Sequence, residues 1–187
     1  MSGKKRLAAL LSTAGILATG LVATTAGTAQ AAVTVDPDAY YEIFPRYFNV
    51  TQPKCLDVPN GSSSLGLRIQ VFHCHGYASN GAPQLWKFVP VGTPLYWIVN
   101  KASGRCLQAP SATSGFIVQN TCSDATRWRL IPANFDTRDM FIGLGLIGSC
   151  VGTANNSGDD HTAVTYQSCS NSSFFSNQVQ QQDWALG

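Results

Sequence analysis

The chain has 187 residues, of which 12% are charged and 44% are hydrophobic, with 12 lysines and arginines against 10 aspartates and glutamates. The net charge of +2 is too small for the basic surface that nucleic-acid binding needs, and the hydrophobic share excludes intrinsic disorder. A charged share about half of the usual value of roughly 25% excludes a coiled coil or helical bundle. A compact, β-rich domain with disulfides among its 6 cysteines remains.

Residues 1–31 have the pattern of a secretory signal peptide. The basic residues Lys4, Lys5 and Arg6 precede an uncharged apolar stretch, and Ala29-Gln30-Ala31 provides a small-residue cleavage pattern. The alternative is a membrane anchor, but serine, threonine and glycine residues interrupt the stretch. We therefore expect cleavage, secretion into an oxidising compartment and, from the alanine- and threonine-rich leader, a bacterial source.

Cleavage leaves nine basic and ten acidic side chains, a net charge of −1. Residues 32–46 are interpreted as an N-terminal extension, with the domain proper over residues 47–187. We expect binding to neither nucleic acid nor a membrane, because no basic patch and no later membrane-length apolar segment occur. We also expect a monomer. The six cysteines allow fifteen pairings, and their number does not choose among them.

The domain contains three aligned units, at about residues 47–94, 95–137 and 138–187. Each unit has a cysteine followed by an apolar residue, a second segment that ends in cysteine, and a final tryptophan. The first unit contains Lys54-Cys55-Leu56-Asp57-Val58, Ile69-Gln70-Val71-Phe72-His73-Cys74 and Gln84-Leu85-Trp86. The second contains Arg105-Cys106-Leu107-Gln108-Ala109, Ile117-Val118-Gln119-Asn120-Thr121-Cys122 and Thr126-Arg127-Trp128. The third contains Ser149-Cys150-Val151-Gly152-Thr153, Val164-Thr165-Tyr166-Gln167-Ser168-Cys169 and Gln182-Asp183-Trp184.

Short apolar runs alternate in each unit with glycine, asparagine, serine and proline. This pattern predicts strands of about four to seven residues and no long helices. About twelve short strands in three repeats suggest a closed all-β barrel capped by hairpins at one end, which leaves no exposed sheet edge.

These motifs resemble the ricin B-type β-trefoil family of carbohydrate-binding modules, over about residues 47–187. Gln84-Leu85-Trp86 and Gln182-Asp183-Trp184 match the Gln-x-Trp signature of that family, whereas Thr126-Arg127-Trp128 keeps only the tryptophan. The resemblance implies three pseudo-symmetric lobes with buried signature tryptophans. It also implies one disulfide in each lobe, namely Cys55–Cys74, Cys106–Cys122 and Cys150–Cys169.

The resemblance further implies a sugar site in the first lobe. Asp57 stands where the family places a carboxylate that accepts bonds from sugar hydroxyls, and Gln70 where it places an amide. Phe72 stands where a ring packs on the sugar, and Gln84 is the signature glutamine. Pro83 departs from the pattern, because it replaces an asparagine and offers no amide hydrogen. The remaining groups predict a dissociation constant on the order of millimolar.

The other two lobes lack this set of groups. The matching positions hold Gln108, Val118 and Asn120 in the second lobe, and Gly152, Thr165 and Gln167 in the third. We interpret both lobes as structural. The alternative for the first lobe is also a purely structural role. In that interpretation Asp57 caps a turn and Phe72 is partly buried beside the disulfide.

Other chemistry has weaker support. The Gly-rich run at 143–148 lacks the strand and helix of a dinucleotide site, so we expect no cofactor. In His73-Cys74-His75, neighbouring strand residues point to opposite faces and Cys74 belongs to the repeat, so no metal site is expected. The segment after the leader has a single glutamate, Glu42, and no paired carboxylates in a recognisable setting, which argues against a glycosidase.

The sequence thus predicts a secreted, non-catalytic module that binds a polysaccharide or glycan, with galactose- or xylose-type sugars as candidates. The alternative is a trefoil that has lost sugar binding and acts as a protein-interaction or inhibitor scaffold. The motif loss in two lobes motivates this alternative, as does a long segment at 170–180 before the last signature, which is suited to presenting a binding loop.

Overall fold

The computed structural model describes residues 33–46, 52–77, 79–112, 114–132, 139–144, 149–168 and 182–187. These residues form an all-β structure with three short 3-10 helices and no α-helix. The expected signal peptide, Cys169 and the 170–180 segment lie outside the described residues. No helix in the described ranges is long and apolar enough to span a membrane.

The described ranges contain thirteen strands, close to the predicted number, and they belong to one sheet. In chain order the strands are β1 (Tyr41–Pro45), β2 (Lys54–Asp57), β3 (Gln70–His73), β4 (Leu85–Gly92), β5 (Leu95–Asn100), β6 (Cys106–Gln108), β7 (Gly115–Phe116), β8 (Val118–Asn120), β9 (Trp128–Pro132), β10 (Asp139–Gly143), β11 (Ser149–Thr153), β12 (Thr162–Ser168) and β13 (Trp184–Leu186). The 3-10 helices are η1 (Pro59–Gly61), η2 (Ser79–Gln84) and η3 (Ala154–Asn156).

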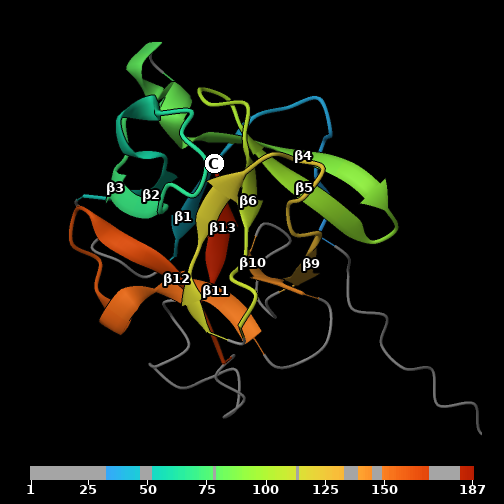
Figure 1. Ribbon diagram of the computed structural model, residues 1–187. Helices are drawn as coiled ribbons and strands as arrows, with labels where there is room; N and C mark the ends of the chain where they lie inside the picture. The colour runs from blue at the N-terminus through green and yellow to red at the C-terminus, as the bar shows by residue number, and fades with distance from the viewer. Residues whose placement is uncertain are drawn as a thin grey trace, which may run out of the picture.

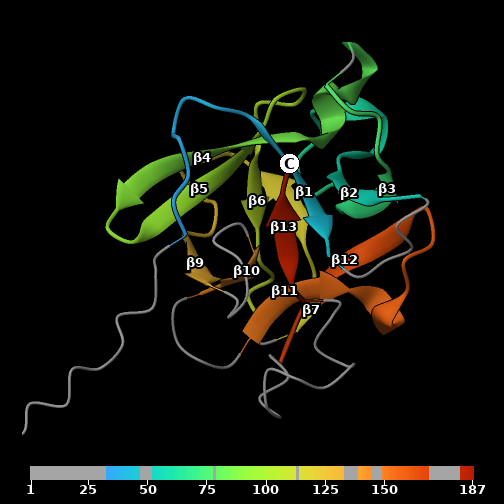
Figure 2. The same ribbon diagram turned by 180° about the vertical axis from the view of Figure 1, so that it is seen from behind.

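The first and last strands lie side by side in the middle of the molecule (Figures 1 and 2). Strand β1 pairs antiparallel with β13 on one side and with β4 on the other. The sheet therefore begins before residue 47, where the sequence placed the start of the domain, and the segment read as an extension contributes a strand. Ile43 of β1 is fully buried in the core, which explains why this strand docks there.

The three repeats form equivalent structures around one core. The indole Nε1 of each signature tryptophan donates to the main-chain oxygen of the residue that follows the first cysteine of its repeat. These bonds are Trp86 to Leu56 at 2.8 Å, Trp128 to Leu107 at 2.9 Å and Trp184 to Val151 at 3.0 Å. All three tryptophans are fully buried, as the resemblance implies. The structure is therefore the expected β-trefoil.

Two of the expected disulfides lie within the described residues. Cys55 is bonded to Cys74, and Cys106 is bonded to Cys122. Cys150 is also disulfide-bonded, and its expected partner Cys169 lies outside the described residues. Each of the two observed disulfides links a strand to the segment that directly follows its paired strand in the same repeat. It therefore stabilises that lobe and does not connect it to another lobe.

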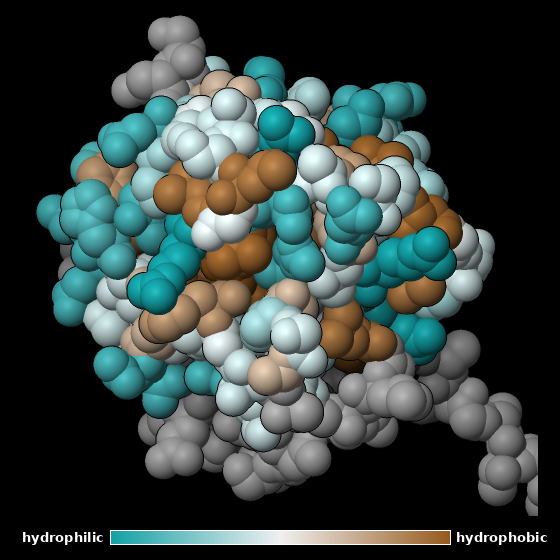
Figure 3. Space-filling view, viewed as in Figure 1, coloured by the Kyte–Doolittle hydropathy of each residue, from teal (hydrophilic) through white to brown (hydrophobic). Residues whose placement is uncertain are grey.

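Apolar side chains are not confined to the core. On the face seen in Figure 3, several apolar patches are separated by polar side chains. The large apolar side chains that are exposed in the described residues are those of Tyr40, Leu65, Tyr77, Phe116 and Leu144. Exposed apolar side chains are common on the surfaces of folded domains.

A carboxyl group in the third repeat is buried without a hydrogen-bond partner, in the described part of the chain, for one of its oxygens. Asp183, inside the third signature, is 7% exposed, and its Oδ1 atom has no hydrogen-bond partner among the described residues. Burial raises the pKa of Asp183 to about 6, although the charge of Arg46 acts to lower it. The folded protein therefore binds this proton more tightly than the unfolded chain does.

The Asp183→Asn variant is expected to be more stable than the wild type above pH 6 and equally stable below pH 4. The ionised carboxylate opposes folding at high pH, and this penalty disappears as the pH falls through the raised pKa. We expect a difference of about 1–2 kcal/mol at neutral pH, below the full value for the shift because relaxation and water penetration reduce the cost of burying a charge. Urea unfolding at several pH values measures it.

The matched control is Asp38→Asn, since the Asp38 side chain is 92% exposed. This variant removes the same charge, and its stability should follow the pH dependence of the wild type. A constant stability difference between Asp183→Asn and the wild type from pH 4 to 8 would show that the Asp183 carboxyl does not oppose folding.

Candidate functional site

The predicted carboxylate and amide of the first lobe lie opposite each other on two paired strands. Asp57 ends β2 and Gln70 begins β3, and the antiparallel register places them directly across from each other. The Gln70 Nε2 atom donates to Asp57 Oδ2 at 2.8 Å. Directly paired strand residues bring their side chains to one face of the sheet, so this pair forms one polar unit.

The Asp57 carboxylate is largely enclosed by protein. Its residue is 5% exposed, and burial raises its pKa above the ordinary value. Hydrogen bonds from Gln70 and Gln84 act against this rise, as do the nearby His75 and His161. A buried carboxylate makes stronger bonds than an exposed one to any hydroxyl group that reaches it.

The expected stacking ring is surrounded by histidines. Phe72 lies one residue before the end of β3 and is half-buried. Its ring centre is 4.1 Å from that of His73, 4.8 Å from that of His161 and 5.6 Å from that of His75. All 3 histidines of the chain therefore gather around Phe72. A sugar at this site would meet imidazole rings as well as the phenyl ring.

Gln84 differs from the expectation that it contacts sugar. The side chain is fully buried, and both ends of its amide bind the main chain of the histidine segment. Its Nε2 atom donates to the oxygen of His73 at 2.9 Å, and its Oε1 atom accepts from the nitrogen of His75 at 2.8 Å. Gln182 makes a similar bond to the oxygen of Ser168 at 3.0 Å in the third lobe. The signature glutamine thus supports the chain after the second strand of its lobe.

A loop from the third repeat completes the site. Asp160 and His161 immediately precede β12, which pairs with β3. The His161 nitrogen donates to the oxygen of Val71 at 3.0 Å, and its Nδ1 atom lies 3.2 Å from Gln70 Oε1. No pattern within the first repeat indicates this contact, because His161 follows Gln70 by 91 residues.

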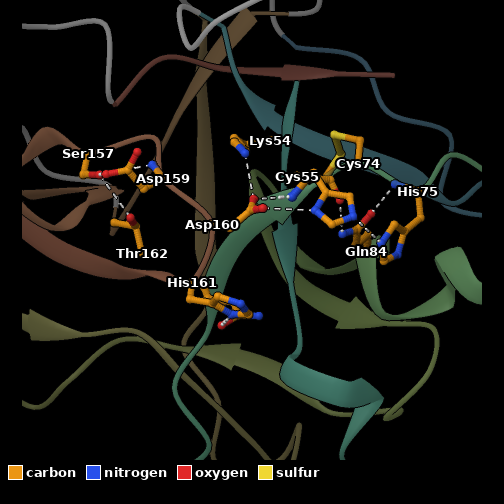
Figure 4. A network of polar contacts seen from close by, with 12 residues as sticks. Lys54, Cys55, Cys74, His75, Gln84, Ser157, Asp159, Asp160, His161 and Thr162 are labelled. Atoms are coloured by element: carbon orange, nitrogen blue, oxygen red, sulfur yellow. Dashed lines mark hydrogen bonds and ion pairs between the residues drawn. A yellow bond between two sulfur atoms is a disulfide. The ribbon is translucent and has the colours of Figure 1, made fainter. Parts of the chain in front are cut away.

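Asp160 binds two basic groups of the first repeat (Figure 4). Its Oδ1 atom accepts from Lys54 Nζ at 2.7 Å and from the His73 nitrogen at 2.8 Å, and its Oδ2 atom lies 3.1 Å from His73 Nδ1. Burial acts to raise the pKa of Asp160, but the bonds from Lys54 and His73 outweigh it and lower the pKa to about 2. Asp160 is therefore ionised at any physiological pH.

A cavity of about 440 Å³ opens beside this network. It is lined by Gln52, Pro53, His73, Cys74 and Asp160. The cavity gives solvent and small ligands access to the His73 side chain, which is 49% exposed.

The equivalent positions of the other two lobes have the strand register expected from the aligned repeats. They do not have the carboxylate and the aromatic ring of the first lobe. Gln108 is paired with Val118 in the second lobe, and Gly152 with Thr165 in the third, in the same register as Asp57 and Gln70. Neither pair has a carboxylate. The ring position of Phe72 corresponds to Asn120 and Gln167, which face Cys106 and Cys150 across their strands, as Phe72 faces Cys55.

Comparisons with known proteins point to one family. The sequence model of the family described as "Ricin-type beta-trefoil lectin domain" matches residues 46–174. A search of curated protein sequences gives no match.

Solved structures with the same fold include lectins and a designed protein. The Macrolepiota procera ricin B-like lectin in complex with lactose is 15% identical, with a TM-score of 0.62 over 82% of this chain and 97% of that one. The Rhizoctonia solani agglutinin is 19% identical, with a TM-score of 0.64 over 83% and 98%. The designed threefold-symmetric protein ThreeFoil is 24% identical, with a TM-score of 0.63 over 79% and 96%. These likenesses show the fold.

Proposed function

Because this chain belongs to the ricin-type β-trefoil lectin domain family, we propose that it is a secreted, non-catalytic module that binds carbohydrate at one weak site in its first lobe. The observation that carries the proposal is the Asp57–Gln70 pair beside Phe72. A carboxylate accepts bonds from two adjacent sugar hydroxyls, and an aromatic ring covers the apolar C–H face of the sugar. The other two lobes lack both groups.

The proposed ligand is a glycan that contains galactose- or xylose-type residues. The lactose bound by the Macrolepiota procera lectin supports testing the galactose type first. Two charge-assisted hydrogen bonds and one ring contact predict a dissociation constant on the order of millimolar.

Calorimetric or NMR titration of the untagged protein with galactose-, xylose- and mannose-type oligosaccharides tests the proposal. The wild type should show saturable binding to one of these classes. Asp57→Asn should lower the affinity at least tenfold, because an amide replaces the charged acceptor while the side-chain volume stays the same. Chemical-shift changes on binding should cluster at residues 57, 70 and 72.

The matched control is Gln108→Ala, which alters the equivalent position of the second lobe. Its glycan affinity should equal that of the wild type. Glycan binding that Asp57→Asn leaves unchanged, or that Gln108→Ala weakens equally, would contradict the first-lobe site. An absence of saturable binding to any glycan would instead favour the protein-interaction or inhibitor scaffold that the motif loss in two lobes suggests.

A further inference from the structure

The His73-Cys74-His75 segment has a geometry that the sugar site does not require. Successive side chains of an extended chain point to opposite sides, so Cys74 points away from His73. His75, two residues after His73, points to the same side as His73. The Nε2 atoms of His73 and His75 lie 3.2 Å apart and form a hydrogen bond, which a bound metal would replace. Two nitrogen ligands of one tetrahedral zinc ion, each at 2.0–2.1 Å, are separated by about 3.3 Å. The two imidazoles already have the spacing of a chelating pair.

The remaining nitrogen of His73 is also suited to a metal ligand. Its Nδ1 atom is 3.1 Å from Asp160 Oδ2, and a carboxylate can only accept a hydrogen bond. A neutral His73 therefore carries its proton on Nδ1 and presents the Nε2 lone pair. Metal-bound histidines commonly have such a carboxylate behind them, which orients the ring and increases its basicity. Lys54 fixes the same carboxylate from its other side.

The main chain between the two histidines is held at three points (Figure 4). Cys74 is linked to Cys55 by a disulfide. The Gln84 amide binds the oxygen of His73 and the nitrogen of His75. A metal would therefore bind ligands that are already ordered, and little conformational entropy would be lost.

We propose that His73 and His75 form a binding site for a divalent transition metal, with Zn²⁺, Cu²⁺ and Ni²⁺ as candidate ions. Imidazole nitrogen suits these ions, whereas Mg²⁺ and Ca²⁺ prefer oxygen ligands. The 440 Å³ cavity that His73 lines gives an ion access to this residue, and water fills the other coordination positions of the ion. The site does not depend on the proposed sugar binding.

Two observations limit the affinity of this site. Metal binding at Nε2 of His75 places its proton on Nδ1, which is buried and has no partner among the described residues. The described ranges also offer no third histidine, cysteine or carboxylate close to both Nε2 atoms. The other group of potential ligands there is Glu42 with Cys55 and Cys74, and its sulfurs are joined in a disulfide. We therefore expect micromolar binding.

Calorimetric titration of the untagged protein with zinc chloride, without any glycan, tests the site. We expect one zinc ion per chain, and magnesium chloride should give no binding. His73→Ala and His75→Ala should each weaken zinc binding more than tenfold. His161→Ala, which removes the remaining histidine of the chain, is the matched control and should bind zinc as the wild type does.

A separate variant tests whether Asp160 orients the His73 ring for metal binding. Asp160→Asn should weaken zinc binding about 10–100-fold, as is usual for the partner of a metal-bound histidine, while the neighbouring Asp159→Asn has no effect. In the wild type, zinc should shift the imidazole NMR signals of His73 and His75 and leave those of His161 in place. This measurement needs no variant, so it holds even where a substitution disturbs folding.

Three results would overturn the proposal. The first is no zinc binding up to millimolar concentration, and the second is zinc binding that His75→Ala leaves unchanged. The third is an equal loss of binding in His161→Ala, which would place the ion elsewhere. Glycan titration is a separate experiment, so failure of the metal site and failure of the sugar site can be told apart.

Discussion

Replacing Trp128 by alanine is expected to lower the free energy of unfolding by about 3–5 kcal/mol. Trp128 is fully buried, and its indole Nε1 donates to the main-chain oxygen of Leu107. Its ring also meets that of Tyr166 edge-on, with centres 6.1 Å apart, so it joins the second repeat to the third. Alanine would leave a cavity between the repeats and an unpaired buried oxygen, and both effects oppose folding.

Chemical unfolding, followed by far-ultraviolet circular dichroism, measures this loss. A reduction of this size is a large fraction of the 5–15 kcal/mol that is typical of folded domains. Trp128→Phe should give an intermediate value, because it keeps most of the apolar volume but loses the hydrogen bond. The control is Leu65→Ala, since Leu65 is 54% exposed and should change stability by less than about 0.5 kcal/mol. Equal losses in both alanine variants would contradict the role of Trp128 in the core.

Removing the Cys55–Cys74 disulfide is expected to affect both stability and binding. The variant with both cysteines replaced by alanine should lose about 3 kcal/mol, because the unfolded chain regains the freedom of a loop with a sequence separation of 19. Cys74 lies between His73 and His75, and Cys55 faces Phe72 across the strands. Zinc and glycan affinity should therefore fall as well, under conditions in which the variant is still folded.

The second disulfide provides a matched control. Cys106–Cys122 has a sequence separation of 16, so its removal should cost about the same free energy. It lies in the second lobe, whose equivalent positions lack the carboxylate and the ring, and this variant should keep the affinities of the wild type. If both disulfide variants bind zinc and glycan equally well, the Cys55–Cys74 bond does not order the site.

Strand β1 illustrates where reasoning from repeats was incomplete. The family resemblance carried by the repeated cysteines and tryptophans implied the trefoil, the two observed disulfides and the burial of Trp86, Trp128 and Trp184, and the structure confirms these features. Strand β1 lies before the first cysteine and has none of the repeated residues. Its position became visible only through its pairing with β13 and β4, which are distant from it in the sequence.

The residues of the proposed sugar site were also predicted only in part from the sequence. The family resemblance led to Asp57, Gln70 and Phe72, and the register of β2 and β3 brings them together. Gln84 also belongs to the signature, but a sequence motif does not reveal whether an amide faces solvent or the main chain. In the structure it binds the main chain of His73 and His75 and is fully buried.

The repeat could be read from the amino-acid sequence alone, because it depends on residue types at matching positions. The pairing of the cysteines and the choice of the lobe that keeps a carboxylate came from the resemblance to the ricin B-type family, applied to those positions. The fold was needed to show that Asp160 and His161 of the third repeat border the first lobe. It also shows that all 3 histidines surround Phe72 and that two of them face each other. These contacts arise because β12 pairs with β3, and such a long-range pairing leaves no local pattern in either segment.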